Sequence, residues 1–143
     1  MSQPNLDCIL LIDDDEATNF VHEWVIRQAG AATHVEACQS AFDGLDYIQA
    51  KEPVANPDDP QPGIIFLDIN MPGMNGWEFL EKYEQLPQEK KAQILVVMLT
   101  TSLNPDDRKK AESLADINCF MSKPLTEEMV KKLIEDNYVK KSA

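Results

Sequence analysis

Short apolar runs alternate along this chain with longer stretches in which apolar residues recur every three or four positions. A short apolar run bounded by turn residues predicts a strand buried on both faces of a sheet, and the longer spacing predicts an amphipathic helix. The predicted strands span about residues 8–12, 33–37, 64–67, 94–99 and 119–122. The predicted helices end near residues 29, 51, 86, 115 and 138.

Regular alternation of strands and helices predicts a parallel sheet covered by helices on both faces. Because crossovers between parallel strands are right-handed, the economical arrangement is a flavodoxin-like, doubly wound (βα)5 fold of the α/β class with strand order 2-1-3-4-5. In such a sheet ligands bind beyond the carboxyl ends of the strands, at the switch point between strands one and three. The residues that follow the strands are therefore the first candidates for chemistry.

Acids, a hydroxyl and a lysine stand at these strand ends. Asp13 and Asp14 follow the first strand, Asp68 the third, Thr100 the fourth and Lys123 the fifth. An isolated Asp in such a place is usually a turn or capping residue, and an isolated Lys is usually a solvated surface charge. A parallel sheet, however, would bring all of these ends to one edge.

Three carboxylates held together repel one another unless they bind protons or a cation. Oxygen ligands without His or Cys favour a hard ion, and Mg²⁺ fits because it accepts a few carboxylates and keeps several waters. A metal with free positions attracts a phosphoryl group, to whose oxygens Lys123 offers a positive charge and Thr100 a hydroxyl. A carboxylate can be the nucleophile of phosphoryl transfer, which points to Asp68.

Five pieces in this order resemble the signature of the response regulator receiver domain, of the CheY-like superfamily. The resemblance implies a phosphoacceptor of two-component phosphorelay signalling, phosphorylated at Asp68 by a histidine kinase or a histidine phosphotransfer protein and acting on a downstream target protein. It implies no enzyme beyond a receiver that assists its own phosphorylation and dephosphorylation. The matching pieces are Ile12-Asp13-Asp14, Asp68 with Met71-Pro72 and Gly76, Thr100, and Lys123-Pro124.

The resemblance also implies a metal site. Asp14 would bind Mg²⁺ directly and Asp13 largely through water, and Asp68 and the backbone carbonyl of Asn70 would supply the remaining ligands.

Further roles follow from the same resemblance. Thr100 and Lys123 would hold the phosphoryl oxygens, and Phe120 would be the switch aromatic coupled to Thr100. Asn70 and Ser102 fill the two variable positions that tune hydrolysis in the family. The fourth helix, fifth strand and fifth helix would form the output face.

Thr101 and Asp15 are sequence neighbours of the candidate site residues. Thr101 stands where the family usually has Ala, Gly or Ser, and its larger side chain would narrow access to the phosphoryl group. Asp15 completes the acidic run, but its place fits the start of the first helix better than a metal ligand.

The helix predicted from about residue 104 is nearly polar and should be loosely held, as a surface element or as one that repacks in a switch.

Composition narrows the class of partner. A formal net charge of −12 over 143 residues argues against nucleic acid and anionic membranes, because both need clustered Lys and Arg. No apolar stretch approaches membrane-spanning length and no signal peptide is present, so we expect a cytoplasmic protein. The spacing of Cys8, Cys38 and Cys119 fits neither a disulfide framework nor a zinc site, and reduced, buried thiols are expected.

We expect a single domain over residues 1–143, with its core at about 7–138. The Pro-rich segment 52–63 is expected to be a surface loop rather than a binding loop. Because the sequence ends soon after the last predicted helix, a stand-alone receiver is expected.

Three other classes of protein share part of this sequence pattern. A phosphatase of the haloacid dehalogenase type would need a second Asp where Asn70 stands, and a cap or a longer core. A flavodoxin would need a Ser-, Thr- or Gly-rich phosphate cradle in place of the acidic run. A non-phosphorylated pseudo-receiver, acting as a protein-interaction module, usually loses an acid or the Lys, and this chain keeps them. The sequence leaves open the cognate kinase, the target, the phosphate lifetime and a phosphorylation-dependent homodimer.

Overall fold

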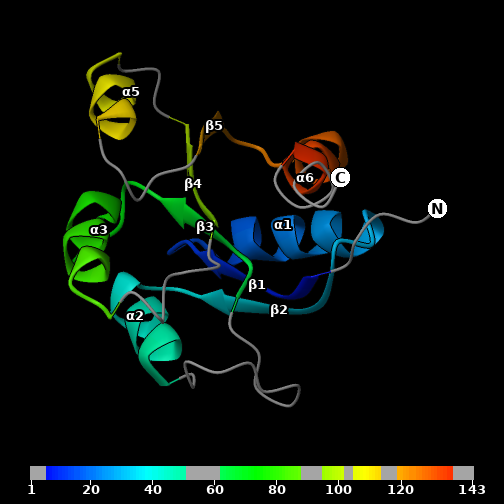
Figure 1. Cartoon of the computed structure of the whole chain (residues 1–143), viewed down its shortest axis with the longest axis horizontal. Helices are drawn as coiled ribbons and strands as arrows, with labels where there is room; N and C mark the ends of the chain where they lie inside the picture. The colour runs from blue at the N-terminus through cyan, green and yellow to red at the C-terminus, as the bar shows by residue number, and fades with distance from the viewer. Residues whose placement is uncertain (1–5, 51–61, 88–94, 102–104, 114–118, 137–143) are drawn as a thin grey trace.

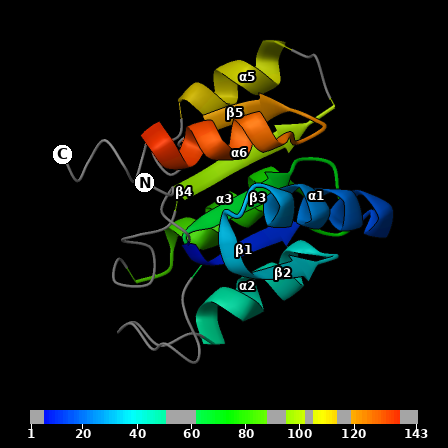
Figure 2. The ribbon, with the colours of Figure 1, turned by 90° about the vertical axis from the view of Figure 1, so that its right-hand side faces the viewer.

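A five-stranded parallel sheet with helices on both faces forms the molecule (Figure 1, Figure 2). The structure is a computed structural model that describes residues 6–50, 62–87, 95–101, 105–113 and 119–136. The strands lie in the order β2-β1-β3-β4-β5. The predicted doubly wound fold and its strand order are therefore confirmed.

The elements lie close to their predicted positions. The strands β3 and β4 each run one residue further than expected, so that Asp68 and Thr100 are their last residues. Most of the predicted loop 52–63 and the predicted end of the last helix near residue 138 lie outside the described residues. The strands are β1 Leu6–Ile12, β2 Ala32–Cys38, β3 Ile64–Asp68, β4 Leu95–Thr100 and β5 Cys119–Ser122. The helices are α1 Glu16–Gln28, α2 Ala41–Ala50, α3 Gly76–Glu84, α5 Pro105–Glu112 and α6 Glu127–Ile134.

Two apolar cores lie on opposite faces of the sheet because successive strand residues point to opposite sides. From β1, Leu10 and Ile12 join the core under α2 and α3, whereas Ile9 and Leu11 join the core under α1 and α6. The central strands β3 and β4 are therefore buried at every residue and apolar up to their last residues, Asp68 and Thr100. Polar side chains are then left for the strand ends.

The first helix differs from its prediction. In the sequence, Phe20, Val21, Trp24 and Val25 recur at a spacing that predicts one apolar helix face, yet Phe20 is 74% exposed, Trp24 is 55% exposed and Val21 is also exposed. From the sequence, His22 on the same helix is expected to be partly exposed and structural. That predicted exposure is wrong, because this side chain is only 3% exposed. The inner face of α1 consists of residues three or four apart, two of which are polar. The buried residues are Asn19, His22, Val25 and Ile26.

The structure also bears on the expected burial of the cysteines and on the expectation that no segment spans a membrane. Cys8 and Cys38 are buried thiols, as expected, and burial raises the pKa of the Cys38 thiol to about 12. The side chain of Cys119 lies outside the described set. Among the described helices, none combines the length and the apolar character that crossing a membrane requires.

Candidate functional site

Three carboxylates meet at the carboxyl ends of the two central strands. Asp13 directly follows β1 and Asp68 ends β3, and both are buried, while Asp14 is exposed. One carboxylate oxygen from each lies within 4.8 Å of the others. The sheet therefore brings together the acids that the sequence had placed at separate strand ends.

Hydrogen bonds at the start of α1 orient the acidic run Asp13-Asp14-Asp15. Asp15 is the N-cap, and its carboxylate accepts hydrogen bonds from the amide of Ala17 at 3.2 Å and from the hydroxyl of Thr18 at 2.6 Å. The amide of Asp15 in turn donates to Oδ1 of Asp13 at 2.9 Å. Asp15 thus caps the helix, as expected, and leaves Asp13 and Asp14 to face the site.

Lys123 reaches this cluster from the end of β5. Its Nζ lies 2.5 Å from Oδ2 of Asp13 and 3.1 Å from Oδ1 of Asp68. Its backbone N–H donates to the carbonyl of Thr100 at 2.9 Å, and the peptide bond to Pro124 is cis. Burial acts to lower the pKa of Lys123, but the hydrogen bond to Asp13 and the charge of Asp68 outweigh it, so that the pKa lies above its ordinary value. The ammonium is therefore charged and held between two carboxylates.

The negative charge of the cluster is only partly compensated. Burial raises the pKa of Asp68, the charge of Asp13 adds to this, and Lys123 opposes both. Three carboxylates face one ammonium within the cluster that the structure describes. All the ligand atoms are oxygens, which suits a hard divalent cation. The residues present therefore fit a metal of the Mg²⁺ type.

The turn after Asp68 requires a glycine for steric reasons. A Cβ added to Gly76 would lie 2.5 Å from the carbonyl oxygen of Asp68 and 3.0 Å from Cα of Ile69. The N–H of Gly76 donates to the carbonyl of Ile69 at 2.8 Å, which closes the turn. Asn75 and Glu78 form a capping box at the start of α3. The backbone of Gly76 is thereby packed directly against Asp68.

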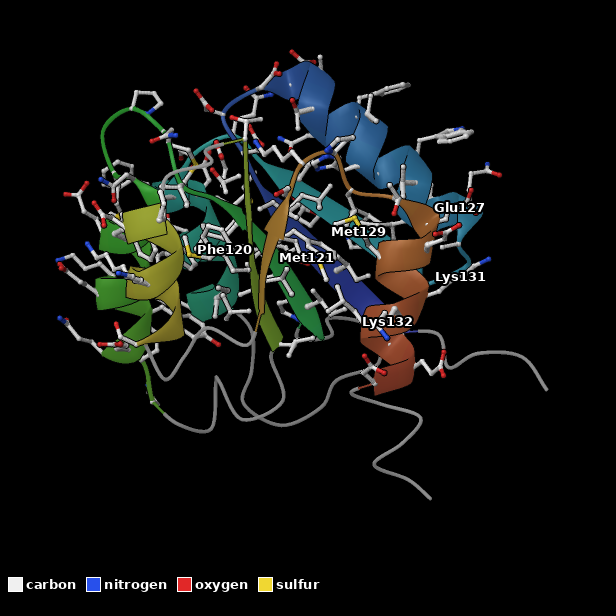
Figure 3. All side chains as sticks on the ribbon, turned by 90° about the horizontal axis from the view of Figure 1, so that it is seen from above. Phe120, Met121, Glu127, Met129, Lys131 and Lys132 are labelled. Atoms are coloured by element: carbon white, nitrogen blue, oxygen red, sulfur yellow. The ribbon has the colours of Figure 1, made fainter. Side chains whose placement is uncertain are left out.

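The remaining predicted residues lie around the cluster. Thr100 is fully buried at the end of β4, and Thr101 is exposed beside it. Asn70 is exposed, and Ser102 lies outside the described residues. Phe120 is half-buried and points to the side of the sheet that carries α3 and α5, whereas Met121 points to the side of α6 (Figure 3). The coupling of Phe120 to Thr100 stays a prediction.

Two polar residues of α1 were not recognised from the sequence. The side-chain amide of Asn19 donates to the carbonyl of Asp13 at 2.9 Å. Nε2 of His22 accepts a hydrogen bond from the amide of Leu125 at 3.4 Å. The available signal was their spacing, since Asn19, His22 and Ile26 follow one another at three and four residues, the period of one helix face.

A cavity opens beside Lys123. Its volume is about 360 Å³, and it is mostly apolar. Val21 and His22 of α1 line it on one side, and Thr101, Lys123 and Pro124 line it on the other. The exposed Val21 of α1 therefore lines the same cavity as Lys123.

Comparison with known proteins assigns the class. A model of the response regulator receiver domain matches residues 9–135, and the chain belongs to this family. Response regulator Rcp1 of Synechocystis sp. is 30% identical over 115 residues, which cover 80% of this chain and 75% of Rcp1.

Solved structures agree with this assignment. A two-component response regulator from Cytophaga hutchinsonii superposes with a TM-score of 0.83 at 32% identity and covers 93% of this chain and 97% of its own. The Mn²⁺-bound form of Rcp1 superposes with a TM-score of 0.64 at 28% identity, covering 91% of this chain and 90% of that one.

Proposed function

We propose that this receiver domain is a phosphoacceptor in which Asp68 takes a phosphoryl group from a histidine kinase or a histidine phosphotransfer protein, with Mg²⁺ as the cofactor. One observation carries the proposal: Lys123 Nζ lies 3.1 Å from Asp68 Oδ1 at the edge of a three-carboxylate cluster. A buried carboxylate with an adjacent fixed cation is the arrangement that aspartyl phosphate formation needs.

The chemistry assigned to the chain is a single displacement. An oxygen of Asp68 forms a bond to phosphorus as the phosphorus–nitrogen bond of the donor breaks, and the electron pair leaves with the donor imidazole. Lys123 neutralises charge on the phosphoryl oxygens, and the hydroxyl of Thr100 donates to one of them. Because Asp68 and Thr100 are buried, little water competes with the donor.

The metal would be held by the acids of the cluster. Asp13, Asp14 and Asp68, with the backbone carbonyl of Asn70, are the proposed ligands. When bound, Mg²⁺ would supply neutralisation of the negative charge that gathers on the transferring group.

The proposed output is a change of protein contacts. Thr100 and Phe120 would form the switch, and α5, β5 and α6 would form the face that a downstream target or a second copy binds. Asn70 and Ser102 would tune hydrolysis, and Thr101 would limit access to the phosphoryl group. In this proposal residues 1–143 are one receiver domain, with a core of about 7–138, and not an enzyme acting on other molecules.

The surface beside the site favours a protein donor. Phe20, Val21 and Trp24 of α1 are exposed, and Val21 also lines the cavity next to Lys123. Exposed apolar side chains on the helix that lines this cavity suit a protein that delivers phosphate, whereas the net charge of −12 does not suit nucleic acid. A cytoplasmic location is part of the proposal and agrees with the buried thiols of Cys8 and Cys38.

The test is the intact-protein mass after incubation with acetyl phosphate, with and without Mg²⁺, beside Asp68→Asn. We expect an adduct of one phosphoryl group that needs both Mg²⁺ and Asp68. Adduct formation in Asp68→Asn at the wild-type level would refute the assignment of the acceptor. Neither metal binding nor an adduct would favour the pseudo-receiver, which binds proteins without being phosphorylated.

A further inference from the structure

The turn that carries Lys123 is fixed on two sides. On the side of β4, the N–H of Lys123 donates to the carbonyl of Thr100 at 2.9 Å. On the side of α1, the N–H of Leu125 donates to Nε2 of His22 at 3.4 Å. His22 and Leu125 are 3% and 2% exposed. The second hydrogen bond therefore lies in the interior, where water cannot replace a lost acceptor.

The same face of α1 also holds the backbone of Asp13. Asn19 stands three residues before His22, so that both side chains lie on one side of the helix. The Asn19 amide donates to the carbonyl of Asp13 at 2.9 Å in a buried position. One helix thus fixes Asp13 at one point and the turn of Lys123 at another. The distance between the Asp13 carboxylate and the Lys123 ammonium depends on both contacts.

The contact with Leu125 sets the state of the His22 ring. Because Nε2 accepts a hydrogen bond, it must be unprotonated, and the neutral ring then carries its proton on Nδ1. Burial lowers the pKa of His22, the positive charge of Lys123 lowers it further, and the charge of Asp13 opposes them. A protonated ring would turn Nε2 into a donor that faces the donor of Leu125. The neutral ring is the form that fits this site.

We propose that His22 is a positioning residue for phosphoryl transfer: through the Leu125 amide it keeps Lys123 Nζ within reach of Asp13 and Asp68. This inference rests on the proposed function of Asp68 and adds a residue that does not touch the phosphoryl group. A purely space-filling His22 would stabilise the core without affecting where Lys123 lies. The two roles make different predictions for substitutions that keep or remove the acceptor.

Two substitutions separate the roles. His22→Leu fills the space but cannot accept a hydrogen bond, whereas His22→Gln offers a side-chain oxygen at about the reach of Nε2. We expect His22→Leu to be phosphorylated by acetyl phosphate about tenfold more slowly at saturating Mg²⁺, because a misplaced Lys123 loses contact with the reacting group. His22→Gln should recover most of the rate. Because the rates are compared at saturating Mg²⁺, any change of Mg²⁺ affinity caused by the displaced ammonium does not enter the comparison.

Val25→Ala is the matched control. It lies on the same buried face of α1 and loses core packing without touching the Leu125 contact. It should be less stable but phosphorylated at the wild-type rate. A wild-type rate in His22→Leu, or equal losses of rate in all three variants, would overturn the proposal.

A measurement on the unchanged protein does not depend on the folding of any variant or on phosphorylation. Long-range proton–nitrogen NMR should find the His22 proton on Nδ1 and none on Nε2 at neutral pH. A proton on Nε2 would overturn the proposal. If Asp68 accepts no phosphate, the proposed function fails. The positioning role of His22 is then tested separately, by measuring the pKa of Lys123 through carbon NMR of its ε position. A Lys123 pKa that falls in His22→Leu and returns in His22→Gln would still support the positioning role, and an unchanged pKa would refute it.

Discussion

Burial of Asp68 disfavours the ionised carboxylate, which is the form that the proposed function needs. It ends a strand whose residues are all buried, and its carboxylate faces that of Asp13. Burial and Asp13 raise its pKa, and Lys123 only partly offsets them. In the proposed function this carboxylate, which is costly to ionise in the free protein, would be the nucleophile of a reaction that adds a cation and a phosphoryl group.

Removing the charge of Asp68 is expected to stabilise the metal-free protein at neutral pH. The folded chain holds this proton more tightly than the unfolded chain, whose ordinary pKa is 3.8. Ionisation therefore costs stability as the pH rises from about that value through the raised pKa, and the cost is complete above it. Asp68→Asn should raise the free energy of unfolding by about 1 kcal/mol at pH 7. Urea denaturation with a chelator present measures this.

The effect should depend on both pH and metal. The advantage of Asp68→Asn should shrink as the pH falls through the raised pKa of Asp68 toward its ordinary value of 3.8, because the carboxyl then becomes protonated. Mg²⁺ at 100 times its dissociation constant should stabilise the wild type by about 2.7 kcal/mol and the variant by less. The exposed Asp14 serves as a control, since Asp14→Asn should change the metal-free stability little. An Asp68→Asn protein less stable than the wild type at pH 7 would contradict the charge balance described above.

Gly76 is the residue where a single methyl group should disturb the site. In Gly76→Ala the new Cβ would meet the carbonyl of Asp68 at 2.5 Å, and backbone atoms cannot move aside as a flexible side chain can. We expect a loss of about 1–3 kcal/mol in unfolding free energy and slower phosphorylation of Asp68. Thermal denaturation and the acetyl phosphate assay measure the two effects.

Gly30→Ala provides the comparison for this prediction. Gly30 has φ of +65° with no atom within 4 Å of an added Cβ, so the substitution strains the backbone far from the site. It should cost about 1 kcal/mol and leave the phosphorylation rate unchanged. Equal rates in both alanine variants would show that the turn after Asp68 tolerates displacement.

Among the helices that the structure describes, α5 has the most polar sequence. One of its side chains contacts α3. Nζ of Lys110 lies 4.8 Å from the ring centroid of Trp77, which is itself half-buried against the core. Trp77 directly follows Gly76, so this contact connects α5 to the turn beside Asp68. Figure 1 shows the two helices next to each other on one side of the sheet.

Lys110→Met is expected to loosen α5. A cation over an aromatic ring at a partly exposed position contributes about 0.5–1 kcal/mol, and methionine keeps most of the length of the side chain without the charge. Hydrogen exchange of the α5 amides should become about two- to fivefold faster. Lys109→Met, one residue earlier on the same helix, should leave exchange unchanged. The same acceleration in both variants would mean that helix charge, and not the Trp77 contact, holds α5.

The strands could be predicted from the sequence and the inner face of α1 could not. A strand buried on both faces is apolar at every position, so a local pattern suffices, and Asp68 and Lys123 then follow from their places at strand ends. The burial of Asn19 and His22 depends on partners elsewhere, since Leu125 lies 103 residues beyond His22 in the sequence. Hydropathy assigns both residues to solvent. The pairing of Lys123 with Asp13 as well as Asp68 likewise appears only in three dimensions.

At the scale of the molecule, the proposed function places recognition of a phosphate donor on the exposed face of α1 and the chemistry at the carboxylate cluster. Phe20→Ser and Trp24→Ser together are expected to slow transfer from a phosphorylated histidine phosphotransfer protein by about tenfold or more, because buried aromatic anchors dominate protein interfaces. Phosphorylation by acetyl phosphate should keep its rate, since neither residue belongs to the carboxylate cluster. Rates with the two donors, measured side by side, test this.

The folded state provides the control for this double variant. Both aromatic side chains are more than half exposed, so the melting temperature should change little. Glu16→Gln, at the start of the same helix, tests whether any change on α1 has the effect. Equal losses with both donors would place Phe20 and Trp24 in the chemistry, contrary to their position.

The position of Lys123 also has a consequence for biosynthesis. The acids of the site come from β1 and β3, whereas the ammonium between them comes from the end of β5, 110 residues after Asp13. A chain that is still being translated can place its acids before it has made the residue that neutralises them. Under the proposed function, a partly synthesised chain would therefore lack a competent phosphoacceptor until nearly the whole domain has left the ribosome.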